Sequence, residues 1–129
     1  MKHTSTLAAM AMLAAPLTVP TSALAHTKVV ASTPAQGTTV KAPRSVSLTF
    51  SEGLLPPTAA ASIVMTAMPG MANHSPMIIR NFTTAWSNGN KTMTLSLRQP
   101  LRAGTYEVRW QSAGADGHRM KGIVNFVAS

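Results

Sequence analysis

A short segment of this chain concentrates sulfur-bearing side chains at a regular spacing. Four methionines and one histidine stand three residues apart between positions 65 and 77: Met65, Met68, Met71, His74 and Met77. The thioether sulfur of methionine is a neutral, soft donor, and soft donors select Cu(I) over Zn(II) or Ca(II). Because the chain has no cysteine, thioethers are the soft ligands it has to offer. The segment therefore predicts a Cu(I) site.

The same spacing also fits one face of an amphipathic helix, whose methionines would be core residues. Pro69, Gly70 and Pro76 interrupt the segment, and these residue types disfavour a helix. We therefore expect a loop whose methionines are free to bind a metal ion. The alternative is that they fill irregular gaps in the core. It applies most directly to Met65, which ends the apolar run from Ala61 and could belong to a strand.

The N-terminal segment, residues 1–25, has the pattern of a secretory signal peptide. It begins with Lys2, continues with an uncharged apolar run over residues 7–19, and ends in a small-residue motif at Ala25. The apolar run is too short for a stable transmembrane helix. Cleavage after Ala25 would make His26 the first residue, and its α-amine and imidazole could then chelate one metal ion.

Length and charge narrow the remaining possibilities. Residues 26–129 number about 104, enough for one domain with a single core. Loss of Lys2 with the signal leaves a net charge of about +7, which favours acidic partners or anionic membrane surfaces. The basic residues are scattered and form no nucleic-acid motif, so we expect no nucleic-acid binding. A solvated basic surface without a partner is the alternative.

The pattern of β-branched and apolar residues predicts an all-β fold. Seven short stretches read as strands: residues 29–32, 46–50, 61–66, 77–84, 92–97, 105–112 and 122–127. Turn-forming residues separate most of them, which favours a sandwich or a Greek-key barrel. Within 105–112, Tyr106, Val108 and Trp110 alternate with Glu107 and Arg109. We expect the first three side chains in the core and the two charged ones in water.

A second group of candidate ligands follows the stretch 105–112. Asp116 and His118 are two residues apart, so in extended backbone their side chains would point the same way. A carboxylate oxygen and an imidazole nitrogen could complete a site begun by His26, and such a nitrogen and oxygen set suits Cu(II). An Asp-Gly turn beside a surface histidine is the alternative explanation.

Taken together, these motifs resemble the CopC/PcoC family of periplasmic copper-resistance proteins over nearly all of residues 26–129. The residues that carry the resemblance are His26, 32–35 with Gly37, the Thr-Phe-Ser-Glu motif ending at Glu52, the methionine segment 65–77, 91–93, 103–106, Trp110 and 116–118. Each motif is weak by itself, whereas the set is specific.

The resemblance implies a fold and two copper sites. The fold would be a Greek-key β-barrel of about seven strands, cupredoxin-like or immunoglobulin-like. Cu(II) would be held by His26, Asp116 and His118, with Glu52 nearby in a ligand or supporting role. Cu(I) would be held by some of Met65, Met68, Met71, His74 and Met77.

The function implied is to sequester and transfer copper in the periplasm, in copper resistance or homeostasis, without catalysis. An inner-membrane copper permease and a periplasmic multicopper oxidase are the partners that the resemblance implies. The protein would be a monomer, or a dimer in which copper bridges His26 of one molecule and the methionine loop of another. Two alternatives remain: a copper monooxygenase with an N-terminal histidine, and an immunoglobulin-like interaction module.

Overall fold

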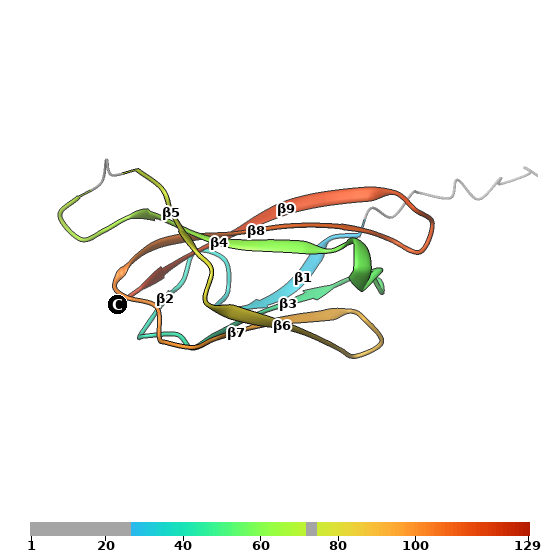
Figure 1. Cartoon of the computed structure of the whole chain (residues 1–129), viewed down its shortest axis with the longest axis horizontal. Coiled ribbons are helices and arrows are strands. Elements are labelled where there is room, and N and C mark those ends of the chain that lie inside the picture. The colour runs from blue at the N-terminus through green and yellow to red at the C-terminus, as the bar shows by residue number, and fades with distance from the viewer. Residues whose placement is uncertain (1–26, 72–74) are drawn as a thin grey trace, which may run out of the picture.

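The protein is built from two antiparallel sheets packed face to face. The computed structural model describes residues 27–71 and 75–129. Its elements are β1 (Val29–Thr33), β2 (Thr39–Val40), β3 (Ser45–Phe50), the 3₁₀ turn η1 (Pro56–Thr58), β4 (Ala60–Ala67), β5 (Met77–Ile79), β6 (Phe82–Ser87), β7 (Thr92–Leu97), β8 (Gly104–Ala113) and β9 (Arg119–Ala128). One sheet has the order β1-β3-β7-β6 and the other β2-β9-β8-β4-β5. Figure 1 shows the two layers, and only the short β2 pairs in parallel.

Strand β8 shows why these sequences form half-buried strands. Its residues alternate in burial, so that Tyr106, Val108 and Trp110 are buried, as the sequence predicts. Glu107 and Arg109 point away from the core and form an ion pair with an N–O distance of 2.8 Å. The pair is partly exposed, so it contributes little stability, about 0–1 kcal/mol. Burial of the apolar face is what fixes the strand.

Aromatic contacts tie the core together within and between the sheets. Phe50 of β3 meets Trp110 of β8 edge to face, with ring centroids 4.8 Å apart. Tyr106 stacks on Phe126 at 5.5 Å in the five-stranded sheet. Gly122 of β9 lies opposite Trp110. A Cβ on residue 122 would stand 2.8 Å from the indole nitrogen, so this position requires glycine. The core is therefore shaped by its largest rings and by one glycine that makes room for them.

The sequence correctly predicts the all-β class, and two details differ. Of the two predicted architectures the structure is the sandwich, since its two sheets do not close into a barrel, and nine strands lie in the described residues where about seven were expected. Residues 77–84 form two strands, β5 and β6, which belong to different sheets. No glycine or proline marks the crossing at Arg80 and Asn81, so the pattern reads as continuous. Strand β2 has two residues, too few to show a period.

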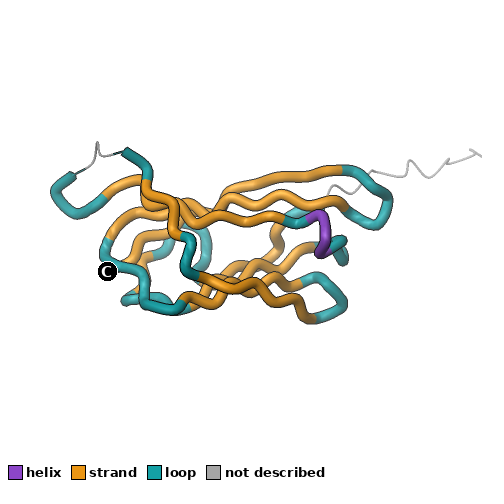
Figure 2. Tube along the Cα trace, viewed as in Figure 1, coloured by secondary structure: helices purple, strands orange, loops and turns teal. Residues whose placement is uncertain are grey.

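The long strands place two groups of loops at opposite ends of the molecule. Strand β8 begins at Gly104 beside the end of β4 and finishes at Ala113 beside the start of β9. Ten residues at about 3.3 Å each separate its ends by roughly 30 Å. Figure 2 shows the strands along the long axis and the loops at the two ends. In the part of the chain that the structure describes, no helix is long and apolar enough to cross a membrane.

Candidate metal centres at the two ends of the sandwich

We call the end where β4 finishes and β8 begins the methionine end. Here Met68 and Met71 close a tight turn by bonding to each other: the Met71 N–H donates to the Met68 carbonyl at 3.0 Å, and the Met68 N–H to the Met71 carbonyl at 3.3 Å. Pro69 and Gly70 occupy the two central positions, and Gly70 has φ +75°. Proline followed by glycine with positive φ is the pattern of a type II turn.

This reciprocal pairing decides where the two thioethers point. Directly opposed residues of an antiparallel bridge carry their side chains on the same face, with Cα atoms about 5.5 Å apart. Met68 and Met71 form such a bridge, and their side chains are 39% and 57% exposed. Two unbranched, flexible side chains on one face can therefore bring both sulfurs to a single ion.

The remaining predicted sulfur ligands fall into different environments. Met77 opens the edge strand β5 and is 52% exposed. Met65 lies opposite it in β4, yet it is 4% exposed and belongs to the core cluster, with its methyl group against Gly104. The structure thus brings Met68, Met71 and Met77 to the surface of one end and uses Met65 for packing. His74 lies outside the described residues.

We call the opposite end, where the β8–β9 turn lies, the aspartate end. Two backbone hydrogen bonds close the turn. The Gly114 N–H donates to the His118 carbonyl at 3.0 Å, and the Gly117 N–H donates to the Gly114 carbonyl at 2.9 Å. Gly117 has φ +82°, a conformation that favours glycine. The backbone between Asp116 and His118 is therefore a turn and not the extended segment that the sequence suggests.

The turn nevertheless brings the Asp116 and His118 side chains together. Asp116 Oδ1 accepts a hydrogen bond from the His118 backbone N–H at 3.1 Å, and Oδ2 lies 2.7 Å from His118 Nδ1. These hydrogen bonds, the one from the His118 side chain above all, lower the pKa of the Asp116 carboxyl. In the neutral tautomer whose Nδ1 carries the proton, Nε2 of His118 has a lone pair that could bind a metal ion. A carboxylate that orients a histidine in this way is common at metal sites.

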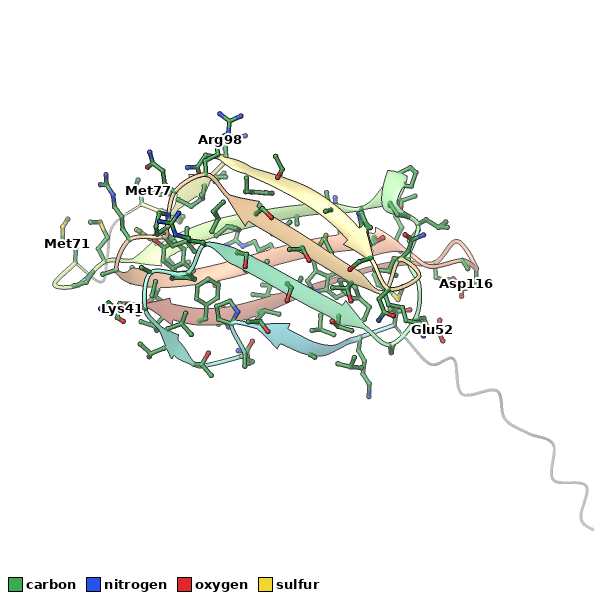
Figure 3. The ribbon with its side chains drawn as sticks, turned by 90° about the horizontal axis from the view of Figure 1, so that it is seen from below. Lys41, Glu52, Met71, Met77, Arg98 and Asp116 are labelled. Atoms are coloured by element: carbon green, nitrogen blue, oxygen red, sulfur yellow. The ribbon has the colours of Figure 1, made fainter. Side chains whose placement is uncertain are left out.

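Two other segments meet this turn. The buried Thr27 places its hydroxyl 3.9 Å from the position that a Cβ on Gly114 would take. The Ser51 N–H donates to the Lys28 carbonyl at 2.9 Å, and Leu54 forms a bridge with Gly114. Glu52 is therefore held between two contacts of the aspartate end, and Figure 3 shows it in the same half of the molecule as Asp116.

In the described residues, the proposed Cu(II) site consequently consists of two adjacent side chains, Asp116 and His118, and not of a complete set of metal ligands. Among the residues that the structure describes, no three His, Asp or Glu side chains are grouped closely enough to hold a metal ion. Asp116 and His118 are together, Glu52 lies at the same end, and His26 is outside the described residues. A metal ion here would need further ligands besides this pair.

Gly114 is a residue of this end that sequence reasoning missed. A Cβ at this position would lie 3.2 Å from Asp116 Oδ1 and 3.4 Å from the Met120 methyl group. The absence of a side chain lets the Asp116 carboxylate fold back over the turn. A glycine two residues before the Asp-Gly-His motif was the available signal. Met120 is half-buried and packs against the core, so we interpret it as a packing residue of β9.

Fold and donor groups together define a class of protein: a small β-sandwich with candidate metal-binding side chains at its two ends. The CopC domain matches residues 29–129. The chain therefore belongs to the CopC family.

Individual relatives agree with this assignment. The chain is 44% identical over 117 residues to copper resistance protein C of Pseudomonas syringae pv. tomato, which covers 89% of this chain and 90% of that protein. It is 37% identical over 105 residues to copper resistance protein C of Escherichia coli, covering 81% of this chain and 82% of that one.

Solved structures share the fold. The crystal structure of PcoC, a methionine-rich copper resistance protein from Escherichia coli, aligns with a TM-score of 0.72 at 34% identity, over 81% of this chain and 100% of PcoC. CopC from Methylosinus trichosporium OB3b aligns with a TM-score of 0.64 at 24% identity, over 81% of this chain and 94% of that one. At that identity the second match supports the fold alone.

Proposed function

We propose that this chain is a copper-binding copper resistance protein that sequesters copper and passes it on, and that it is not an enzyme. One observation carries the proposal: the chain offers two chemically different donor sets at opposite ends of a rigid sandwich. Exposed thioethers stand at one end and a carboxylate paired with an imidazole at the other. Family membership supports copper as the ion.

The methionine end would bind Cu(I). Met68 and Met71 would act as the central pair, because their turn holds both thioethers on one exposed face. Met77 would supply a third sulfur from the neighbouring edge strand, and His74 would be a further candidate. Neutral sulfur donors match a monovalent soft ion without adding charge to the site. We assign Met65 to the core and not to the ligand set.

The aspartate end would bind Cu(II) through His118 and Asp116 with His26. Thr27 is packed beside Gly114, and consecutive Cα atoms are about 3.8 Å apart. The described chain thus begins beside the turn that carries the pair, which supports His26, its neighbour in sequence, as a ligand. If export removes residues 1–25, the α-amine and imidazole of His26 would become available at this point. Glu52 would serve as a supporting carboxylate or an additional ligand.

Copper handling of this kind fits a periplasmic location. The pattern of residues 1–25 supports export, and a thioether site remains functional where thiols would be oxidised. An inner-membrane copper permease and a periplasmic multicopper oxidase would be the partners. Ligand-by-ligand exchange between the exposed methionines and those of a partner would move Cu(I) without releasing it into water.

Copper titration of two matched proteins tests the proposal. One protein starts at His26 and the other carries one extra residue before it, and each is titrated with Cu(II) and then with Cu(I) under reducing conditions. The extension should abolish tight Cu(II) binding and leave Cu(I) binding intact, because it converts the α-amine to an amide. Equal Cu(II) affinity in both proteins would remove His26 from the site. Absence of stoichiometric binding of either ion would refute the function.

A further inference from the structure

The methionine end also gathers a large share of the positive charge of the protein. Five exposed basic residues lie in the loops and strand ends of this end: Lys41, Arg44, Arg80, Arg98 and Arg102. Figure 3 shows Lys41 and Arg98 in the half of the molecule that contains Met71 and Met77. Although these residues are scattered in sequence, the fold brings them to the same end as the methionine turn, and we call the five residues the basic ring.

Backbone hydrogen bonds show how the fold assembles this basic ring. The Leu97 N–H donates to the Arg44 carbonyl at 2.9 Å, and the Arg98 N–H to the Asn81 carbonyl at 3.0 Å. The Tyr106 hydroxyl donates to the Arg102 carbonyl at 2.7 Å. The loops that carry the arginines are therefore tied to one another and to β8. The ring is a fixed feature of the fold and not a set of independent chain ends.

Acidic side chains do not neutralise this ring. The chain has three, and all lie in the described residues. Glu52 and Asp116 occupy the opposite half of the molecule, as Figure 3 shows, and Glu107 is paired with Arg109 at 2.8 Å. In the described structure none of the five basic residues of the ring forms an ion pair.

Exposed apolar side chains lie at the same end of the molecule as the basic ring. Met68, Met71 and Met77 are 39%, 57% and 52% exposed. Ile78, also 52% exposed, follows Met77 in β5, so its side chain points to the opposite face of that strand. Few protein surfaces place several large apolar side chains together and exposed without a reason. Exposed apolar side chains with charged residues at the same end are typical of a protein-docking surface, and methionine side chains adapt their shape to different partners.

We propose that the methionine end is a docking surface for a partner protein with an acidic, methionine-containing face. The basic ring steers and orients the partner, and the exposed Met68, Met71 and Met77 make the contact. Its purpose, transfer of copper at the thioethers, rests on the proposed function, whereas the docking itself does not require metal. An anionic membrane is the less suitable occupant. Proteins that lie on membranes use exposed aromatic anchors, and the six aromatic side chains of this chain are all buried or half-buried.

A charge-matched pair of variants tests the surface. The first replaces three basic residues of the ring, Arg44→Gln, Arg80→Gln and Arg98→Gln. The control replaces three exposed lysines of the opposite half, Lys28→Gln, Lys91→Gln and Lys121→Gln. Both variants lose the same net charge, so a general electrostatic attraction would weaken equally in the two. All six side chains are exposed, and substitutions at such sites change stability by about 0.5 kcal/mol or less.

The probe is a fluorescein-labelled peptide that repeats Glu-Glu-Met, with a Gln-Gln-Met peptide for comparison, and the metal-free protein is titrated at low and at physiological salt. We expect the ring variant to bind the acidic peptide about tenfold more weakly and the control variant within about twofold of the parent. In ¹⁵N-labelled protein, the peptide should shift the resonances of residues 41–44, 68–71, 77–80 and 98–102.

Three results would overturn the proposal: equal weakening in the two variants, no preference for the acidic peptide over the Gln-Gln-Met peptide, or shifts confined to the aspartate end. Vesicles of phosphatidylcholine and phosphatidylglycerol are titrated in parallel. Stronger ring-dependent binding to these vesicles than to the peptide would assign the surface to lipid. Cu(I) titration of the same proteins without peptide separates the two proposals, because failure there refutes the metal site and leaves the docking result standing.

Discussion

One strand, β8, connects two ends of this sandwich that have opposite chemistry. At its start, exposed neutral sulfurs share one end of the molecule with five basic side chains that form no ion pair in the described structure. At its finish, about 30 Å away, a carboxylate and an imidazole contact each other and a second carboxylate, Glu52, lies in the same half. A copper ion that changes its oxidation state changes its preferred donors. The separation is therefore consistent with the two distinct copper sites that we propose.

The two ends also differ in how firmly their donors are held. The Asp116 carboxylate makes two hydrogen bonds to His118, so the pair is preorganised before any metal arrives. Met68 and Met71 share a rigid turn, but their sulfurs stand at the tips of flexible, exposed side chains. A preorganised pair favours tight retention, whereas mobile thioethers favour exchange. The following predictions test whether the ends are independent.

Removing one donor from each end should give the largest effect. His118→Ala should lower Cu(II) affinity at least about 100-fold, beyond the range typical of a supporting residue, and leave Cu(I) affinity within about twofold. Met71→Leu should lower Cu(I) affinity about tenfold, equivalent to about 1.4 kcal/mol, and leave Cu(II) affinity within about twofold. Competition titrations with chelators of known affinity measure both. A loss of both ions in either variant would show that the ends share one site.

Met65 should behave as a core residue, in contrast to its neighbours in sequence. Because it is buried, Met65→Ala should lower the free energy of unfolding by about 2–5 kcal/mol. The volume-conserving Met65→Leu should cost less than about 1.5 kcal/mol and leave Cu(I) affinity unchanged. Urea denaturation and Cu(I) titration of the variants, with Met71→Leu as the exposed control, measure both quantities. A fall in Cu(I) affinity for Met65→Leu would return Met65 to the ligand set.

Substitutions of two glycines at the ends of β8 should separate an effect on core packing from an effect on the position of the Asp116 carboxylate. A Cβ at Gly104 would meet the Ala67 carbonyl oxygen at 2.8 Å, and backbone yields poorly. We expect Gly104→Ala to cost about 1–3 kcal/mol of stability without changing Cu(II) affinity. At Gly114 the nearest atoms belong to the movable Asp116 and Met120 side chains. Gly114→Ala should therefore cost less stability but weaken Cu(II) binding severalfold, which thermal unfolding and Cu(II) titration would distinguish.

The smallest expected effect is the pH dependence that the Asp116 contact gives the metal-free protein. Hydrogen bonds to His118 lower the pKa of this carboxyl from its ordinary value of 3.8. A lowered pKa in the folded state means that the stabilisation is present above pH 3.8 and is lost as pH falls through the folded-state pKa. Asp116→Asn should lack this loss, so its Tm should fall less between pH 4 and pH 2. Identical acid profiles would show that the contact contributes no stability.

Much of the fold follows from local pattern. Alternation identifies the inward face of β8 at Tyr106, Val108 and Trp110 because a strand repeats every two residues. The division of residues 77–84 between two sheets does not follow, because strands of both sheets share that period and nothing in the sequence marks the crossing. The contact between Asp116 and His118 was foreseeable from spacing, although a turn produces it. Whether Met65 is a buried core residue or an exposed ligand did not follow from the sequence, because its place in a regular repeat of methionines does not reveal how deeply it is buried.

The sequence by itself determined the chemistry available to this protein. It contains soft sulfur donors but no thiol, three acids and an excess of basic side chains, because residue type is a local property. Tertiary structure alone decided how these groups are sorted. Strand pairing sends Met68, Met71 and five basic residues from four separate segments to one end, and Asp116 and Glu52 to the other. Residues far apart in sequence meet only when sheets form, since long-range pairing is set by burial of the core and not by neighbouring residues.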